Sequence, residues 1–448
     1  DVSIASIAHV TVGTDIISGT PAIAGTTTLS VPGIIISGTI YSNEVPTAYN
    51  CSTGNVIVRV AKNGILAQSV TCTVAGGTYA LPKVTGAVAG DVLTIFIDDV
   101  TASKQASVVT KANDGTSPIT IDLYQQRVIV RNENSVATTN TNMGAYDSVD
   151  NANIKFTESL GALTIASGNK LIVWTGKTFT PGGTVTTTPA STAANPDGDI
   201  TIQVGATLSM GANTLSIGGD FTNSGTFSYG AGQTTTFIAT GTGHIIEDGT
   251  NNFDNVIFNG SGGGWRFNSD VVLAGDITIT LGTLTSFGST VTVNGGDVTG
   301  NGVINMTGAG TFVVNNAGNF GGDTAWTFNT LTIGAAGNAI TTATGTGSIT
   351  IGNSFVIDIG DTLDAKGKNW IISDDSHFGN TMTINGTLND STDTSTFSFT
   401  GYNGGGDTTI PASTGYNNIT IGHGTTADNY TIGAGTVTMS GDLSIGVN

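Results

Sequence analysis

The residues of this chain that could act as an acid and a base lie in its C-terminal quarter. Asp374 and Asp375 are adjacent carboxylates, and His423 stands between two glycines further along. Inverting hydrolysis of a glycosidic bond needs carboxyl groups on both sides of that bond. An acidic sugar would also need a cation, and no Lys or Arg follows Lys368. We therefore expect no enzymatic activity and interpret these residues as solvated turns.

The two motifs around these residues resemble those of polygalacturonase-like enzymes. Ser373-Asp374-Asp375 is similar to their Gly-Asp-Asp, and Gly422-His423-Gly424 is similar to their Gly-His-Gly. The Asn-Thr-Asp and Arg-Ile-Lys elements of that family are missing here. The resemblance is confined to these short motifs and implies no catalytic residues.

The sequence also lacks potential metal ligands at the spacings that metal sites require. The histidines never pair at a ligand spacing, and Cys-x-x-Cys does not occur. Turn carboxylates at 195–199 and 358–361 match no calcium-binding loop, so we interpret them as capped turns. The sequence predicts no metal site and no cofactor.

Two kinds of surface could bind a ligand without catalysis. Exposed aromatic rings could stack on sugars, although the candidate tryptophans alternate with polar residues in a way that favours core packing. A flat face of Thr-x-Thr could bind ice or another crystal surface, but it requires a constant register on successive coils, and the unequal repeat lengths argue against that. The tryptophans are Trp174, Trp265, Trp326 and Trp370.

Covalent modification is the remaining chemistry. Cys51 and Cys72 are the two cysteines, and their place in strand-rich sequence predicts one disulfide in an oxidising compartment, with two reduced core thiols as the alternative. Sequons for N-glycosylation are frequent, as expected by chance in a sequence rich in Asn and Thr. They are Asn50, Asn259, Asn305, Asn385, Asn389, Asn418 and Asn429.

Composition limits the class of protein. Only 10% of the 448 residues are charged, and the net charge is −19 with 13 Lys and Arg. Ordinary soluble domains carry about 25% charged residues. A chain so poor in cations is not expected to bind nucleic acid, and no apolar run is long enough to insert into a membrane.

A repeated turn and strand organises the last two-thirds of the chain. The stretch at 275–284 begins with Gly-Asp, continues with alternating β-branched and polar residues, and closes with Gly-x-Thr. The stretch at 198–208 matches it closely, and looser copies begin at Gly168, Gly219, Gly352 and Gly441. Gly-Asp supplies a turn, and the alternation predicts a strand.

The N-terminal part differs. We predict an extension over 1–32 and an Ig-like β-sandwich over 33–131, because longer strands recur there between Asn-Gly, Gly-Gly and Gly-Asp turns. The sequence at 37–98 resembles bacterial surface Ig-like domains of the carboxypeptidase-regulatory type. This resemblance implies a spacer or assembly module. Six strands are expected, at 34–41, 55–61, 69–74, 78–81, 92–97 and 119–123.

We predict a junction over 132–153 and a parallel β-solenoid over 154–448. Short strands with Gly and Asn turns recur there without helical periodicity. A propeller is the competitor, but its blades should keep a steadier period. At roughly 20–25 residues per coil we expect about 12 to 15 coils, and with strands about 4.8 Å apart a rod of about 60–70 Å.

This half resembles the repeat regions of secreted autotransporter-like and haemagglutinin-like β-helix adhesins. The resemblance rests on the sequence at 253–284 and on two related repeats that begin at residues 328 and 416. It implies a secreted bacterial surface protein located outside the cell.

Two functions remain open. One is a structural subunit of an extracellular filament or surface layer that assembles head to tail through strand complementation and solenoid-end stacking, with itself as partner. The other is a monomeric adhesin stalk that binds a host surface or surface glycans. The residues expected in self-assembly are Val2, Ile4, Ala8, Val10, Val12, Leu443, Ile445 and Val447.

Overall fold

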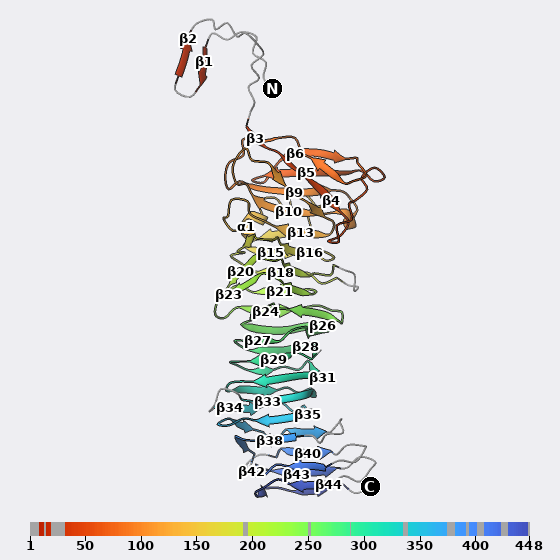
Figure 1. Ribbon diagram of the computed structural model, residues 1–448, viewed down its shortest axis with the longest axis vertical. Helices are drawn as coiled ribbons and strands as arrows, with labels where there is room; N and C mark the ends of the chain where they lie inside the picture. Colours follow the sequence, from red (N-terminus) through yellow and green to blue (C-terminus); the bar gives the residue numbers. More distant parts are fainter. Residues whose placement is uncertain are drawn as a thin grey trace.

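The protein is built almost entirely of β-strands (Figure 1). Two short helices are the exceptions among the described residues, the 3-10 helix η1 (Ala102–Lys104) and the one-turn helix α1 (Asn140–Met143). The all-β prediction is therefore confirmed. The computed structural model describes residues 9–12, 15–18, 32–190, 196–249, 252–286, 288–334, 339–373, 381–390, 394–400, 407–422 and 429–446.

An isolated hairpin lies at the N-terminal end. Strand β1 (His9–Val12) pairs antiparallel with β2 (Asp15–Ser18), in a register that places Val10 opposite Ile17. Neither strand pairs with any other strand that the structure describes. The hairpin therefore does not join the sheets that follow it.

Most of the buried apolar residues between 34 and 129 form a core of their own, to which Ile172 of the coils also contributes. Strand β5 pairs antiparallel with β6 and β9, while β4 pairs antiparallel with β7 and in parallel with β11 and β12. Strands overlap all six stretches in which the sequence predicts them. These strands are β3 (Gly33–Ile34), β4 (Ile36–Tyr41), β5 (Val56–Lys62), β6 (Ile65–Cys72), β7 (Thr78–Ala80), β8 (Val84–Thr85), β9 (Val92–Asp98), β11 (Ile119–Thr120) and β12 (Leu123–Tyr124).

A parallel β-solenoid of about 14 turns follows. Its parallel stacking begins at β10 (Ser107–Lys111), which pairs with β13 (Arg127–Val130), and so starts earlier than the expected residue 154. Both strands are short and buried on both faces, and such a run does not reveal strand direction, so the sequence could not separate these first strands from the sandwich. The expected number of coils is confirmed.

Each full coil contributes a strand to three parallel sheets. The first sheet continues from β10 and β13 through every coil. Long strands turn a corner and serve two sheets. The first sheet contains β16 (Lys170–Val173), β19 (Ile200–Ile202), β22 (Phe221–Asn223), β25 (His244–Glu247), parts of β26 (Asn255–Phe267), β28 (Ile277–Ser286), β31 (Val303–Val314), β33 (Trp326–Ile333) and β35 (Ile349–Ile357), then β37 (Asn369–Ser373), β40 (Thr396–Thr400), β43 (Asn418–Gly422) and β46 (Leu443–Ile445).

The second sheet begins at β15, whose upper edge pairs antiparallel with β14 (Phe156–Ser159). Below β15 its strands stack in parallel. They are β15 (Ala162–Ile165), β18 (Val185–Thr187), β21 (Leu215–Ile217), β24 (Thr234–Phe237), parts of β26 and β28, β30 (Val298–Thr299), β32 (Gly318–Gly321), β34 (Ile340–Ala343), β36 (Thr362–Asp364) and β39 (Thr387–Asn389). In the last coils β42 (Ser413–Tyr416) and β45 (Val437–Met439) form a further parallel pair.

The third sheet lies between the first and second along the path of each coil. It has an upper group of strands and a longer lower group. The strands are β17 (Thr178–Phe179), β20 (Thr207–Gly211) and β23 (Thr226–Tyr229), then β27 (Val271–Leu273), β29 (Thr290–Val293), parts of β31, β33 and β35, β38 (Thr381–Ile384), β41 (Asp407–Ile410) and β44 (Asn429–Ile432).

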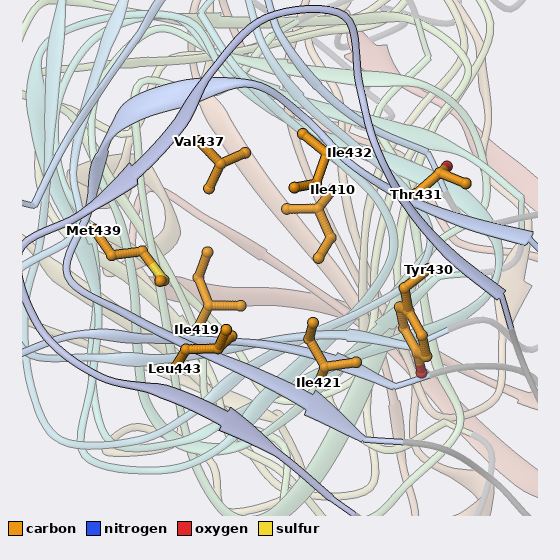
Figure 2. A pocket seen from close by; sticks show the side chains of 9 residues that line it. All are labelled: Ile410, Ile419, Ile421, Tyr430, Thr431, Ile432, Val437, Met439 and Leu443. Atoms are coloured by element: carbon orange, nitrogen blue, oxygen red, sulfur yellow. The ribbon is translucent and has the colours of Figure 1, made fainter.

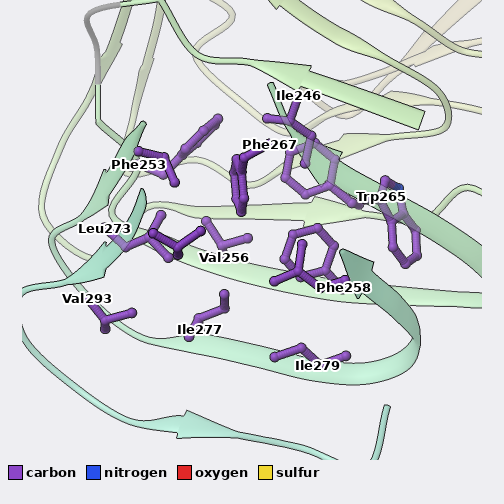
Figure 3. Packing of buried hydrophobic residues seen from close by; sticks show 14 of the residues in the cluster. Ile246, Phe253, Val256, Phe258, Trp265, Phe267, Leu273, Ile277, Ile279 and Val293 are labelled. Carbon is purple, nitrogen blue, oxygen red and sulfur yellow. The ribbon is translucent and has the colours of Figure 1, made fainter. Parts of the chain in front are cut away.

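Apolar side chains fill the interior of the coils. Phe258, Trp265 and Phe267 are buried side by side with Ile277 and Ile279 from the next coil (Figure 3). Because strands have a period of two, inward residues alternate with outward ones along every rung. The result is one continuous core along the rod.

The Gly-Asp repeat has a structural explanation. The backbone N–H of Asp276 donates to Asn255 Oδ1 at 3.0 Å, and the N–H of Asp297 donates to Asp276 Oδ1 at 2.8 Å. A Cβ on Gly275 or on Gly296 would collide with the acceptor oxygen of the coil above. The carboxylate or carboxamide therefore hydrogen-bonds the next coil, and the glycine leaves room for it.

Candidate functional site

The two ends of the solenoid are finished differently. At the upper end β9 pairs with the edge of β10, β14 pairs with the edge of β15, and Thr138 bridges to Phe179 of the third sheet. At the lower end β44, β45 and β46 each pair with a strand of the coil above and with no other described strand. The lower end thus presents open strand edges.

These open edges surround an apolar cavity of about 250 Å³ (Figure 2). Ile419 is 2% exposed because its register partner Leu443 covers it, whereas Leu443 itself is 50% exposed. Ile445 is 61% exposed at an equivalent inward position. The cavity is lined by Ile410, Ile419, Ile421, Tyr430, Thr431, Ile432, Val437, Met439 and Leu443.

The series of hydrogen bonds that links the Gly-Asp turns of successive coils also stops at this end. The N–H of Asp442 donates to Asn418 Oδ1 at 2.8 Å, as in the coils above. Among the described residues, no N–H donates to the carboxylate of Asp442. The lower end therefore offers a hydrogen-bond acceptor, open strand edges and an apolar hollow to whatever covers it.

The residues predicted for self-assembly lie at opposite ends of the rod. Val10 and Val12 are in β1, beyond the upper end, while Leu443 and Ile445 are in β46 at the lower end (Figure 1). The remaining four predicted residues, Val2, Ile4, Ala8 and Val447, lie outside the described residues.

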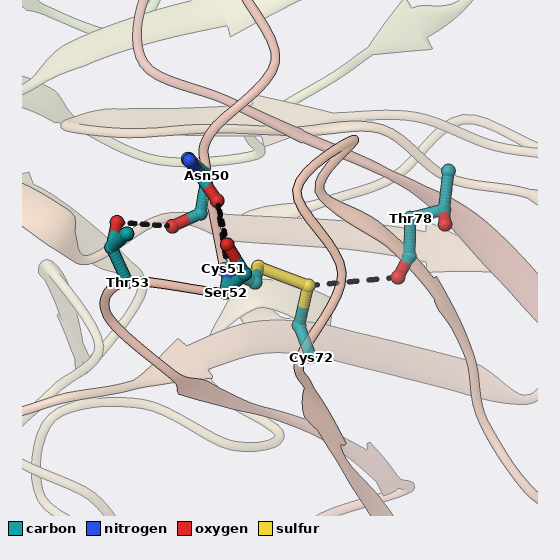
Figure 4. Close-up of a disulfide and its surroundings, with 6 residues drawn as sticks. All are labelled: Asn50, Cys51, Ser52, Thr53, Cys72 and Thr78. Carbon is teal, nitrogen blue, oxygen red and sulfur yellow. Dashed lines mark hydrogen bonds between the residues drawn. A yellow bond between two sulfur atoms is a disulfide. The ribbon is translucent and has the colours of Figure 1, made fainter.

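The predicted disulfide is confirmed. Cys51 and Cys72 are bonded with a Cα–Cα distance of 5.6 Å, and both side chains are buried in the N-terminal core (Figure 4). The bond joins the turn before β5 to the end of β6. The disulfide therefore constrains the N-terminal strands above the solenoid, and it does not constrain the coils.

The sequons differ in what their carboxamides do. Asn50, Asn259, Asn305, Asn385 and Asn389 are exposed. Asn418 donates from Nδ2 to the carbonyl of Ser395 at 3.1 Å and accepts from Asp442, so its carboxamide has a structural role. The side chain of Asn429 is outside the described residues. Glycosylation stays a prediction.

A cluster of acids around one histidine was missed from sequence. His244 Nδ1 lies 3.1 Å from Asp220 Oδ1, and His244 Nε2 lies 3.9 Å from Asp197 Oδ2. The N–H of Asp220 donates to Asp199 Oδ1 at 2.9 Å. These residues come from different coils, so only the coil register brings them together, and no local motif signals the cluster.

The cluster holds protons close to neutral pH. Burial, followed by a hydrogen bond with Asp197, raises the pKa of Asp199 to about 7. A hydrogen bond with Asp220 raises the pKa of His244, and burial opposes that shift. Asp199 and His244 are only 7% and 6% exposed, so a polymeric substrate cannot reach them. We interpret the cluster as structural.

The residues weighed for other chemistry are dispersed. Asp374, Asp375, His377 and His423 lie outside the described residues, and the side chain of His9 does too. Within the described ranges no three acidic, His or Cys side chains are placed to hold a metal ion. Trp265, Trp326 and Trp370 are buried, so they offer no platform for sugars.

Comparison with known proteins finds no matching family model, no matching curated relative and no matching solved structure. No helix among the described residues is long and apolar enough to cross a membrane.

Proposed function

We propose that this protein is a structural subunit of an extracellular filament or surface layer, and that its subunits join head to tail. One observation carries the proposal: the upper edges of all three sheets are covered, while the lower end exposes an apolar cavity and open edges. Soluble repeat proteins need capped ends, and exposed edge strands invite pairing with another chain.

The hairpin β1–β2 is the proposed donor. A two-stranded hairpin is marginally stable alone in water, so a further strand would stabilise it. Its register places Val10 opposite Ile17 and Val12 opposite Asp15. Adding a strand edge of this hairpin to the lower end of a neighbour would cover the cavity, as in strand complementation.

Such a contact joins two different surfaces, so it is heterologous. A heterologous contact that does not close into a ring produces a filament. The hairpin and β46 lie at opposite ends of a long rod, which favours open polymers over closed rings.

In this proposal the residues before β10 form an Ig-like module that caps the rod and acts as a spacer. Its disulfide is the feature that supports secretion into an oxidising compartment, because cytosolic proteins rarely keep such bonds. The acidic, cation-poor composition supports an extracellular role without nucleic acid partners.

The experiment uses the full chain and three variants under electron microscopy and sedimentation. We expect filaments from the wild type, and single rods when residues 1–31 are deleted or when Ile445→Asp places a charge at the open end. Val204→Asp is the matched control, because Val204 is 69% exposed on the side of the rod. This variant should still polymerise.

Two results would overturn the proposal. Wild-type protein that stays a single rod at high concentration would favour the monomeric adhesin stalk. Filaments that persist in both end variants would show that assembly uses another surface.

A further inference from the structure

The core of the N-terminal strands reaches onto the outer face of the first sheet. Along β16, Leu171 and Val173 belong to the core of the coils, whereas Ile172 belongs to the N-terminal core. Because successive residues of a strand point to opposite faces, Lys170 and Trp174 lie on the same outer face as Ile172. Trp174 packs against the N-terminal core but stays partly exposed, while the other three tryptophans are buried. It is therefore the one tryptophan that a ligand can reach.

Three aromatic rings and one guanidinium group stand in a row at this place. The rings of Tyr41 and Tyr124 stack with their centroids 5.0 Å apart, and the centroids of Tyr124 and Trp174 are 5.7 Å apart. The guanidinium carbon of Arg131 lies 5.7 Å from the centre of the Trp174 ring. All four side chains are partly exposed, and we call them the aromatic row.

The rings of this row cover one another's faces and leave their edges free. Tyr41 stacks on one face of Tyr124, and Arg131 covers one face of Trp174. An aromatic ring is negative on its face and positive at its edge. The exposed edges therefore favour an anionic ligand over a neutral apolar one.

Cations surround the aromatic row. Four Lys and Arg side chains form ion pairs with two glutamates, at N–O distances of 2.6 to 3.3 Å. Four positive and two negative charges leave a positive excess, which remains when Asp122 near Tyr124 is counted. The chain as a whole has a net charge of −19, and only three of its 13 Lys and Arg come after Lys177. The pairs are Arg127 and Lys170 with Glu44, and Arg131 and Lys177 with Glu133.

The aromatic row also presents hydrogen-bond donors that the described part of the chain does not use. Among the described residues, none accepts from the indole N–H of Trp174 or from the terminal nitrogens of Arg131, and none bonds the hydroxyls of the two tyrosines. Lys170 Nζ contacts a single carboxylate, although an ammonium group can donate three bonds. A ligand for this surface should therefore be rich in acceptor oxygens and carry negative charge.

We propose that the aromatic row and the four cations around it bind an acidic polysaccharide, whose sugar rings carry carboxylates. The carboxylates accept from Lys170 and Arg131, and the hydroxyl and ring oxygens of the sugars accept from Trp174 and the tyrosines. Charge-assisted hydrogen bonds supply most of the affinity, because they are the strongest that the site can make. The site lies near the upper end of the rod, away from the apolar cavity at the lower end, so it does not depend on the head-to-tail contact (Figure 1).

Other ligands fit this surface less well. A neutral polysaccharide leaves the positive excess without a partner. An acidic peptide offers carboxylates, but its backbone N–H groups are donors that would face further donors. The bases of a single-stranded nucleic acid stack on open aromatic faces, and the row offers edges instead.

The experiment measures binding of the full chain to three polyuronates, namely polygalacturonate, alginate and hyaluronate. We expect binding to at least one of them, and the affinity should fall as salt screens the exposed cations. Lys170→Gln should weaken this binding by about tenfold, the effect of losing one charge-assisted hydrogen bond. Lys366→Gln is the matched control, because Lys366 also contacts one carboxylate, Asp364 at 3.8 Å, but lies in the lower half of the rod. The control should bind as the wild type does.

Trp174→Ala should weaken binding as well, and circular dichroism checks that this variant folds. If it unfolds, Lys170→Gln decides, because Lys170 is not part of either core. Wild-type protein that binds none of the three polyuronates would overturn the proposal, and so would equal binding by the wild type and Lys170→Gln. Tighter binding of dextran, poly-glutamate or single-stranded DNA than of every polyuronate would also overturn it, because the ligand would then belong to another class.

Discussion

The upper and lower ends of the solenoid differ in how the parallel stack of strands terminates. At the upper end the antiparallel strands β9 and β14 pair with the first rungs of two sheets. At the lower end β46 continues the parallel register of β43 and leaves its other edge open. A parallel coil always leaves an edge for the next coil, so a change of strand direction is an effective way to stop the stack.

The comparison also separates residues that look alike in sequence. Ile419 and Leu443 occupy equivalent inward positions, but only Ile419 is buried. The contribution of an inward residue to stability should therefore depend on whether a coil follows it, because buried area sets the hydrophobic gain.

The largest effect is expected in the middle of the rod. Trp370 is fully buried and stacks on Phe355 at 5.5 Å and on Phe397 at 5.9 Å between ring centroids. Trp370→Ala should lower the free energy of unfolding by about 3–5 kcal/mol, the usual cost of removing a large buried ring. Leu443→Ala at the open end should cost the monomer far less, and equal costs in chemical denaturation would contradict the comparison.

The disulfide should matter next, and only at the capped end. Replacing Cys51 and Cys72 together with Ser should cost about 3 kcal/mol, since the bond closes a loop of moderate length. Hydrogen exchange should rise in β5 and β6 while the coils below β16 stay protected. Exchange that rises equally along the whole rod would show that the cap and coils unfold as one unit.

A smaller loss is expected from crowding one Gly-Asp rung. In Gly275→Ala the new Cβ would displace Asn255 Oδ1, which accepts from the N–H of Asp276. We expect a loss of about 1–3 kcal/mol in thermal unfolding, typical of overpacking. Gly76→Ala is the control, because a Cβ there meets nothing within 4 Å, and it should be nearly neutral.

The smallest effect is a shift with pH. The folded pKa of Asp199 is raised to about 7, that of Asp248 to about 6 by burial, and that of His244 is raised as well. A raised folded pKa gives stability that is lost as pH rises through it. The Tm should therefore fall by a few degrees between mildly acidic and mildly alkaline pH, and Asp199→Asn should reduce this slope. An unchanged slope in that variant would contradict the role given to Asp199.

Much of the architecture could be predicted from sequence. The Gly-Asp repeat and the strand alternation indicated the solenoid and its coil number, and cysteine usage indicated the disulfide. The start of the stack could not be located, because β10 and β13 are short strands buried on both faces, and such runs do not reveal strand direction. The Ig-like assignment for the residues before them stays a prediction.

Side-chain contacts between coils could not be predicted from the sequence. His244 meets Asp197 and Asp220 only because corner loops of unequal length keep the rungs aligned. The same alignment keeps Thr290, Thr311 and Thr330 in one column, although 21 and 19 residues separate them. In both cases the register is set by packing of inward residues in three dimensions, and repeat length does not report it.

Cross-linking between two variants tests the head-to-tail account most directly. Both native cysteines are in one disulfide, so an added cysteine is the free thiol of each chain. One variant carries Val12→Cys in β1 and the other carries Ile445→Cys in β46, and they are mixed under mild oxidation. We expect a disulfide between positions 12 and 445 of different chains, and none when Val204→Cys replaces Ile445→Cys. Failure to form the 12–445 bond while filaments are present would contradict the account.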